Sequence, residues 1–419
     1  MYMNKLKSLI ISILTVCCIF LNGVMADAYT PFSDVVVSLQ IDNPIMEVNG
    51  AQKEIDVGHS TMPVVKNGRT LVPIRGIIEA FGGSVEWDSA SRTVTLTLGE
   101  DIIKLTIDNN LAQLNGKVTT LDVAPAIIGN RTMLPVRFIA ESFNLGVGWD
   151  SENRTVYIVS NSFDDAEYKA LKAQIPDYRG EPYVYINSNQ PFFKDYEIIE
   201  CSFEFYASLD ELGRCDVTMA SVGKDLMPTE KRESISSVTP TGWINNYYDI
   251  IDGGYLYNRC HLIGFQLTGE NANKRNLITG TRYLNIDGML EFENMVDRYV
   301  ENSGNNVMYR STPVFSGNNL VADGVLLEAY SVEDRGQGIS FCVYCYNVQP
   351  GVSINYATGE NAIGKELIAP KENQEERVYR TPTGKRYHFD SECGGKNSYK
   401  VGLNEAENDG LTPCLKCIK

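Results

Sequence analysis

Residue types capable of acid–base and metal chemistry gather in one central stretch of the chain. They are Arg259, His261, Asn276, Asn285 and Glu293. A neutral imidazole with its usual pKa of about 6.5 can take a proton from water at physiological pH. Asparagine and carboxylate oxygens suit a hard cation such as Mg²⁺, which keeps several waters and needs few protein ligands. The stretch therefore has the side chains for a histidine base that acts beside a divalent cation.

A second group of candidate metal ligands lies near the C-terminus. His388 and Cys393 form a His-x4-Cys pair, and Cys414 and Cys417 form a Cys-x2-Cys pair. Three cysteines and one histidine are a ligand set for tetrahedral zinc. One disulfide plus a free thiol is the competing interpretation, and the sequence favours zinc without excluding the disulfide.

Composition limits the possible functions. The 419 residues carry a formal charge of −16 at a pI near 4.8, and this length predicts about two to four domains. The acidic balance argues against a stoichiometric nucleic-acid coat, which needs a broad basic face. His59, His261 and His388 are the only histidines, so mechanisms that need a cluster of imidazoles are excluded.

The N-terminal residues have the pattern of a secretory signal. Lys5 and Lys7 precede an apolar run over 9–21, and small residues near 26–28 suit cleavage, so residues 1–28 are predicted to be removed. The apolar run is short for a bilayer span, which needs about 20 residues. We expect a secreted or cell-surface-associated protein with no transmembrane span after cleavage. Disulfides are permitted among its eight remaining cysteines.

The elements that position the central residues are predicted from hydrophobic patterns. Apolar residues recur at helical spacing over 289–300. Alternating or β-rich runs at 183–186, 306–310 and 339–346 indicate strands. Strands around an embedded helix predict an α+β domain over about 181–364. A polar linker with some helix is expected at 161–180, and a small tail domain, stabilised by metal or disulfide, at 377–419.

The N-terminal region contains an internal repeat with an offset of 62 residues. Arg69-Thr-Leu-Val-Pro-Ile-Arg75 recurs as Arg131-Thr-Met-Leu-Pro-Val-Arg137, and Trp87 recurs as Trp149. Each copy is predicted to form a short strand, a helix that begins near the proline, and a hairpin through a Trp-Asp turn. We expect the tryptophans to be packing residues rather than a platform for carbohydrate.

The repeat region, 36–160, resembles the copper amine oxidase-like N-terminal domain of secreted bacterial proteins. His59 is its only histidine, so no plausible copper ligand set is present and catalysis is not expected. The resemblance implies a two-repeat α+β module with a structural or surface-binding role. A cell-wall or surface component is its candidate partner.

The central residues lie in a motif, Asn258-Arg-Cys-His261, followed by asparagines at 276 and 285 and a glutamate at 293. This pattern resembles the DNA/RNA non-specific endonucleases of the ββα-metal, or His-Me finger, class. The resemblance implies Mg²⁺-dependent hydrolysis of phosphodiester bonds, with little sequence preference. The implied substrate is DNA, with RNA as a second candidate. A surface-binding or adhesion protein with an inactive nuclease-like domain is the alternative.

Roles for individual residues also follow from this resemblance. His261 would be the general base and Asn285 the Mg²⁺ ligand. Glu293 would orient a metal-bound water, Arg259 would contact the phosphate or substrate, and Asn276 would shape the site beside the histidine.

Two further arginines could contact the substrate, and two residues of the motif differ from the family pattern. Arg232 is a candidate phosphate contact, and Arg282 is either another such contact or part of a surface ion pair. The family's usual Asp-Arg-Gly-His has Asn258 and Cys260 in place of its aspartate and glycine. Asn258 carries no charge, while Cys260 makes a left-handed backbone costly and a disulfide possible.

The tail resembles Ada-like zinc-binding tails of secreted nucleases.

Overall fold

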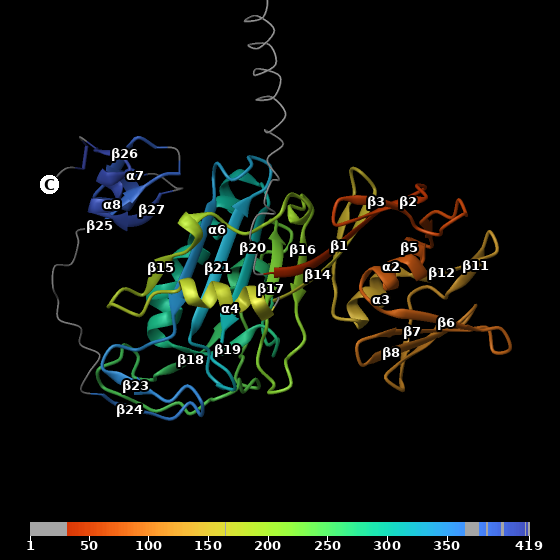
Figure 1. Ribbon diagram of the computed structural model, residues 1–419, viewed down its shortest axis with the longest axis horizontal. Coiled ribbons are helices and arrows are strands. Elements are labelled where there is room, and N and C mark those ends of the chain that lie inside the picture. Colours follow the sequence, from red (N-terminus) through yellow and green to blue (C-terminus); the bar gives the residue numbers. More distant parts are fainter. Residues whose placement is uncertain are drawn as a thin grey trace, which may run out of the picture.

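A computed structural model describes residues 32–163, 165–364, 377–382, 384–394, 398–414 and 416–417. The expected signal peptide, 1–28, lies outside these residues. Figure 1 shows a β-rich N-terminal domain, a central domain in which a sheet packs with helices, and a small C-terminal sheet. The multidomain α+β organisation expected from the sequence is confirmed. Across the described ranges, no helix has both the length and the apolar character that a bilayer crossing requires.

The N-terminal domain consists of three antiparallel sheets, with strand orders β13-β14-β1-β2-β3, β10-β9-β8-β7-β6 and β11-β12-β5-β4. Its elements are β1 (Phe32–Gln40), β2 (Ile45–Val48), β3 (Ala51–Glu54), β4 (Val64–Lys66), β5 (Arg69–Pro73), α2 (Arg75–Ala80), β6 (Ser84–Asp88), β7 (Thr93–Leu98), β8 (Asp101–Thr106), β9 (Leu111–Leu114), β10 (Lys117–Thr120), β11 (Ala126–Ile128), β12 (Arg131–Pro135), α3 (Val136–Ser142), β13 (Gly146–Asp150) and β14 (Thr155–Phe163).

The predicted repeat is present as two equivalent units. In each unit a strand runs into a short helix at the proline, and a hairpin follows. The strands β5 and β12 pair antiparallel with Val72 opposite Leu134, so the units are related by an approximate two-fold axis at this pair. Trp87 and Trp149 retain 42% and 37% of their exposure. The expectation that they are packing residues is therefore wrong, since both rings face solvent.

The central domain has a six-stranded antiparallel sheet of order β15-β22-β21-β20-β17-β16. Its elements are α4 (Asp165–Gln174), β15 (Tyr183–Tyr185), η1 (Asn187–Asn189), η2 (Asp195–Glu197), β16 (Phe203–Tyr206), β17 (Thr218–Val222), β18 (Tyr257–His261), α5 (Phe265–Thr268), β19 (Leu277–Thr281), the π-helix η3 (Leu284–Met289), α6 (Leu290–Ser303), β20 (Val307–Val314), β21 (Gly324–Ser331), β22 (Ser340–Tyr346), β23 (Val352–Ile354) and β24 (Asn361–Ile363).

Helix α6 carries one apolar face into the main core. Phe292, Met295, Val296, Tyr299 and Val300 are all buried in the cluster that also contains the sheet's side chains. This i, i+3, i+4 spacing confirms the helix expected over 289–300. The three strands expected around it are confirmed as β15, β20 and β22.

A buried ion network holds the sheet together near the N-terminal domain. The Arg310 guanidinium lies 2.8 Å from Glu197 and 2.9 Å from Glu328, and none of the three side chains is exposed. The Asn161 amide, on β14, donates to Glu197 at 3.2 Å. Loss of one partner would leave a buried charge unpaired, which costs about 3–5 kcal/mol. The network therefore ties the last strand of the repeat domain to the core of the central domain.

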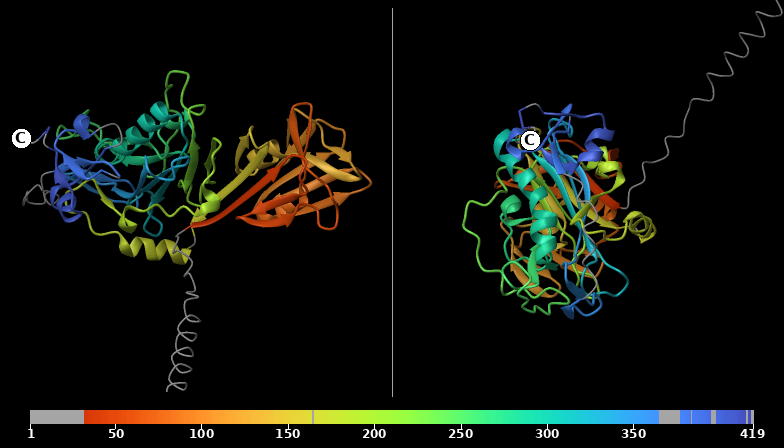
Figure 2. Two further views of the ribbon diagram at one scale, coloured as in Figure 1. Left: turned by 90° about the horizontal axis from the view of Figure 1, so that it is seen from above. Right: turned by 90° about the vertical axis from the view of Figure 1, so that its left-hand side faces the viewer.

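The two domains meet where β13 packs against β16. A Cβ atom at Gly146 would lie 3.0 Å from the Glu204 carbonyl oxygen, and one at Gly148 would lie 2.8 Å from the Cys201 sulfur. Residues with side chains, a serine at 84 and a glutamate at 86, occupy the equivalent positions of the first repeat. The glycines of the second repeat thus make room for the central domain. Figure 2 shows β1 and β14 reaching from one domain to the other.

The C-terminal domain is a four-stranded sheet of order β27-β25-β26-β28. Its elements are β25 (Arg377–Arg380), β26 (Arg386–His388), α7 (Ser391–Gly394), β27 (Tyr399–Gly402), α8 (Leu403–Asn408) and β28 (Thr412–Pro413). The Tyr185 hydroxyl donates to the Lys400 carbonyl at 2.9 Å, and Arg377 donates to the Tyr183 hydroxyl at 3.1 Å. These bonds dock the tail on the edge strand β15.

We predict that Gly148→Glu loosens the junction between the N-terminal and central domains. The added side chain would overpack the contact with Cys201, at a cost of about 1–3 kcal/mol. Small-angle scattering should show a larger radius of gyration, and protease should cut more rapidly near the junction. Glu86→Gln, at the exposed equivalent position, is the matched control and should change neither measurement. An unchanged profile for Gly148→Glu would contradict this role of the glycine.

Candidate active site and C-terminal metal cluster

The central site is built on a hairpin. Strands β18 and β19 pair antiparallel, with His261 opposite Leu277 at the end of the ladder. Because side chains alternate along a strand, Arg259 and His261 point to one face and Cys260 to the other. The helices η3 and α6 follow the hairpin directly, so the segment forms a ββα unit. His261, Asn285 and Glu293 all belong to this one continuous segment.

The imidazole of His261 is held at both nitrogens. Its Nε2 lies 2.9 Å from the Asn271 carbonyl oxygen, and its Nδ1 lies 3.3 Å from an Arg232 guanidinium nitrogen. A carbonyl oxygen can only accept, so Nε2 carries the proton and the Nδ1 lone pair faces Arg232. Burial lowers the pKa of His261 to about 4, with Arg232 acting in the same direction and the Asn271 carbonyl opposing both. The ring is therefore neutral at physiological pH.

Asn276 supports the turn that follows the histidine. Its side chain accepts from the Ile263 amide at 2.8 Å and donates to the Ile263 carbonyl at 3.0 Å. Its own carbonyl accepts from the Leu262 amide at 2.9 Å. The residue is fully buried, and both ends of its amide are used. Asn276 therefore holds the turn after His261 in place, and its buried amide is not available to a substrate.

Glu293 lies over Gly264, close to the histidine turn. A Cβ atom at Gly264 would fall 2.9 Å from the Glu293 carboxyl carbon. Burial raises the pKa of Glu293 to about 8, opposed by Arg232. Within the described ranges the carboxyl group has no hydrogen-bond partner. Arg232 thus electrostatically links His261 and Glu293, and Gly264 provides the space in which the carboxyl group sits.

Asn285 lies in η3, eight residues before Glu293 on a continuous helical path. It is half-buried, and its amide has no hydrogen-bond partner among the described residues. A free amide oxygen and a free carboxyl group are donors of the kind that Mg²⁺ accepts. Each of these two residues therefore offers an oxygen of the kind that a hard divalent cation binds.

Arg259 is fixed beside the site by the loop that precedes the hairpin. Its Nε donates to the Val238 carbonyl at 2.5 Å, and a terminal nitrogen donates to the Ser236 carbonyl at 3.3 Å. The guanidinium carbon lies 4.4 Å from the centre of the Trp243 ring. These contacts orient the guanidinium on the same face of β18 as His261.

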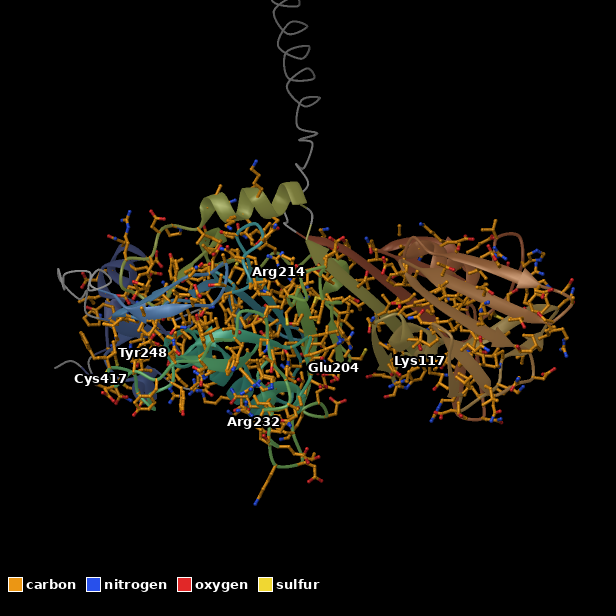
Figure 3. All side chains as sticks on the ribbon, turned by 90° about the horizontal axis from the view of Figure 1, so that it is seen from below. Lys117, Glu204, Arg214, Arg232, Tyr248 and Cys417 are labelled. Carbon is orange, nitrogen blue, oxygen red and sulfur yellow. The ribbon has the colours of Figure 1, made fainter. Side chains whose placement is uncertain are left out.

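The two remaining arginines differ in their surroundings. Arg232 is exposed at the surface of the central domain, where Figure 3 labels it, and it reaches His261. Arg282 forms an ion pair with Asp252 at 3.0 Å, so the structure shows the surface pair that the sequence left open. Only Arg232 of these two is in contact with the histidine.

Cys260 fits without the strain that the family pattern suggested. It is absent from the positive-φ residues, and its buried thiol is free, as are all eight cysteines of the described ranges. A Cβ atom at Gly280, across the hairpin, would lie 2.6 Å from the Cys260 Cβ, so Gly280 leaves the space that the Cys260 side chain occupies. Burial raises the pKa of the Cys260 thiol. Asn258 keeps its side-chain nitrogen buried without a partner in the described part of the chain.

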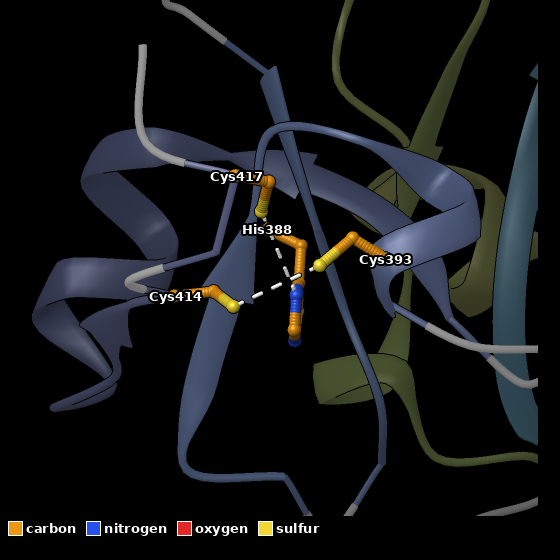
Figure 4. Close-up of side chains that lie close together, drawn as sticks. All are labelled: His388, Cys393, Cys414 and Cys417. Carbon is orange, nitrogen blue, oxygen red and sulfur yellow. Dashed lines mark hydrogen bonds between the residues drawn. The ribbon is translucent and has the colours of Figure 1, made fainter.

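The four C-terminal candidates form one cluster (Figure 4). Ligand atoms of His388, Cys393, Cys414 and Cys417 all lie within 4.8 Å of one another. The Cys393 and Cys414 sulfurs are 3.8 Å apart, as are the Cys417 sulfur and His388 Nδ1. A disulfide needs about 2.05 Å, whereas sulfurs at about 2.3 Å from a tetrahedral zinc lie about 3.8 Å apart. The cluster therefore has the dimensions of a zinc site.

Sequence reasoning missed three residues that shape the central site. Asn271 acts through a backbone carbonyl, which carries no sequence signal. Trp243 contacts Arg259 from a distant loop. Gly264 gave a weak signal, a glycine three residues after the histidine, but only the packing of Glu293 explains it.

Comparison with known proteins supports two domain assignments. Residues 47–158 match the copper amine oxidase N-terminal domain, and residues 195–333 match the DNA/RNA non-specific endonuclease family. Curated proteins give no match.

Solved structures similar to this chain include three nucleases. NucA from Streptococcus agalactiae, with a magnesium ion bound, is 23% identical over 47% of this chain and 93% of its own, with a TM-score of 0.41. The Sda1 nuclease with a bound zinc ion is 23% identical over 43% and 95%, with a TM-score of 0.36. A protein described as an extracellular endonuclease is 19% identical over 45% and 100%, with a TM-score of 0.31.

The matched segments coincide with the repeat domain and with the domain that holds His261. The chain therefore carries a copper amine oxidase N-terminal domain followed by a DNA/RNA non-specific endonuclease domain.

Proposed function

We propose that this chain is a secreted, metal-dependent endonuclease that hydrolyses phosphodiester bonds of DNA, and of RNA through the same backbone chemistry. The observation that carries the proposal is the neutral His261 imidazole, whose Nδ1 lone pair faces the exposed Arg232. Secretion rests on the signal-like N-terminal sequence.

In the proposed reaction His261 takes a proton from water at Nδ1, while the Asn271 carbonyl holds the proton on Nε2. Arg232 occupies that lone pair in the structure, so it must move aside before a water can bind there. Its exposed side chain is free to turn toward a phosphate oxygen, where its charge would neutralise the substrate. Arg259, fixed by two carbonyls and Trp243, would contact the phosphate from the same face.

Asn285 would hold Mg²⁺, with Glu293 orienting a water of its hydration shell. When bound, the cation supplies charge neutralisation at the phosphate and at the leaving oxygen. Glu293 follows Asn285 by eight residues along the helical path. Because Mg²⁺ keeps several of its waters, Asn285 could bind the cation directly while Glu293 contacts one of those waters. The domain's acidic composition predicts weak binding of nucleic acid without the metal.

Loss of the base should nearly abolish cleavage. His261→Ala is expected to lower the rate of plasmid nicking in Mg²⁺ by about 10²- to 10⁴-fold, the usual contribution of a general base. His59→Ala, at an exposed histidine of the other domain, should leave the rate unchanged. Nicking by the His261→Ala protein at the unaltered rate would refute the assignment. Absence of nicking by the unaltered protein would favour the inactive, surface-binding alternative.

The acid limb of the pH–rate profile should report the state of His261. Above a pKa of about 4 the ring is neutral and able to accept a proton, so the part of the acid limb that His261 sets lies near that value. Burial raises the pKa of Glu293 to about 8, opposed by Arg232, so protonation of this carboxyl group sets a separate part of the limb at higher pH. Arg232 lowers the pKa values of His261 and Glu293, so removal of its positive charge raises both. Arg232→Ala should therefore move the acid limb to higher pH, and Arg232→Lys should move it less. Arg232 is the charged side chain that acts on the His261 pKa, and the Asn271 and Glu270 backbones oppose it. An acid limb unmoved by Arg232→Ala would contradict this coupling.

The tail should bind one zinc ion per chain. Native mass spectrometry of protein purified without chelator is expected to show a single zinc that Cys393→Ser or His388→Ala removes. His59→Ala serves as the control and should retain the metal. A metal-free protein whose mass is lower by two hydrogens would instead show a disulfide in the tail.

A further inference from the structure

The N-terminal domain contains two equivalent grooves. One, of about 520 Å³, is lined by Arg69, Arg137 and Trp149. The other, of about 470 Å³, is lined by their counterparts at an offset of 62, namely Arg131, Arg75 and Trp87.

The antiparallel pairing of β5 with β12 creates both grooves. Leu71 lies opposite Pro135 and Met133 opposite Pro73, so the start of each strand adjoins the end of the other. Each groove therefore combines an arginine from one repeat with the helix arginine and the tryptophan of the other. Neither repeat could form a groove alone.

Charges are balanced within each groove. Arg69 pairs with Asp122 at 2.6 Å, and Arg131 pairs with Asp56 at 2.6 Å. Arg75 lies 3.8 Å from Glu79, and Glu141 lines the groove of its counterpart, Arg137. Two guanidinium groups thus accompany each exposed indole ring. Two carboxylates line the first groove, and one, that of Asp56, lines the second.

Several charged and aromatic groove residues are the same in the two repeats. Both arginines, the glutamate and the tryptophan are identical in the two copies. Some buried pairs differ, such as Leu71 and Met133, whereas others are identical, such as Ile77 and Ile139. The identical arginine and tryptophan side chains give the two grooves the same hydrogen-bond donors, so both grooves are suited to the same class of ligand.

We propose that each groove binds a segment of a neutral polysaccharide. A sugar ring would lie on the tryptophan face, and its hydroxyl groups would bond to the guanidinium and carboxylate groups, which together supply donors and acceptors. A nucleic acid is disfavoured because the grooves have no net positive charge and residues 32–163 contain 10 Lys and Arg against 15 Asp and Glu. Two sites on one rigid domain would strengthen attachment to a polymer.

Calorimetric titration of the full-length protein, in chelator to prevent cleavage, tests this inference independently of the nuclease assignment. The probes are six-residue oligomers of β-1,4-linked N-acetylglucosamine, β-1,4-linked glucose and β-1,4-linked mannose, with a twelve-nucleotide thymidine strand as the polyanion. We expect at least one sugar oligomer to bind at two sites. Trp87→Ala or Trp149→Ala should each leave one site, and the double variant should bind at least about tenfold more weakly.

Val118→Ala alters an exposed residue outside both grooves and is the matched control, expected to bind like the unaltered protein. Should the double tryptophan variant fail to fold, Arg75→Gln with Arg137→Gln replaces it, since both side chains are exposed. The proposal is overturned if none of the sugars binds, or if binding survives in the groove variants. Thymidine-strand binding that the groove variants abolish would assign the grooves to nucleic acid instead.

Discussion

The hydrogen bond from His261 Nε2 to the Asn271 carbonyl fixes the chemistry available at the central site. It leaves Nδ1 with the only lone pair of the ring that can accept a proton, and this lone pair faces Arg232. Burial keeps the ring neutral, because an imidazolium at this position would be poorly solvated and would face a guanidinium. The hairpin, the Asn276 clamp and the loop containing Asn271 all serve to maintain this one orientation.

The rest of the site follows from the same ββα segment. A glycine at 264 leaves space for the Glu293 carboxyl group, and the glycine at 280 leaves space for the Cys260 side chain. The departure from the family motif at 260 is therefore compensated across the hairpin, without a left-handed residue or a disulfide. The resting contact between Arg232 and Nδ1 suggests that phosphate binding and exposure of the base are coupled, since one arginine serves both.

Sequence patterns predicted the parts of the structure that depend on periodicity or local turns. The repeat offset and the amphipathic helix α6 are of this kind. The C-terminal cluster was also predictable, because its ligand spacing is local. What the sequence could not supply were contacts through backbone atoms or distant loops, such as Asn271 and Trp243. The exposure of Trp87 and Trp149 was missed because the two-fold pairing of β5 and β12, rather than either repeat alone, decides which face of each hairpin is covered.

Nitrogen NMR of the His261 ring tests the proposed base most directly, and the ring signals can be assigned among three histidines by comparison with His261→Ala. At neutral pH the ring is expected to be protonated at Nε2 and unprotonated at Nδ1, and to titrate well below the usual pKa of histidine. A ring protonated at Nδ1, or one that titrates near 6.5 or above, would contradict this role of His261.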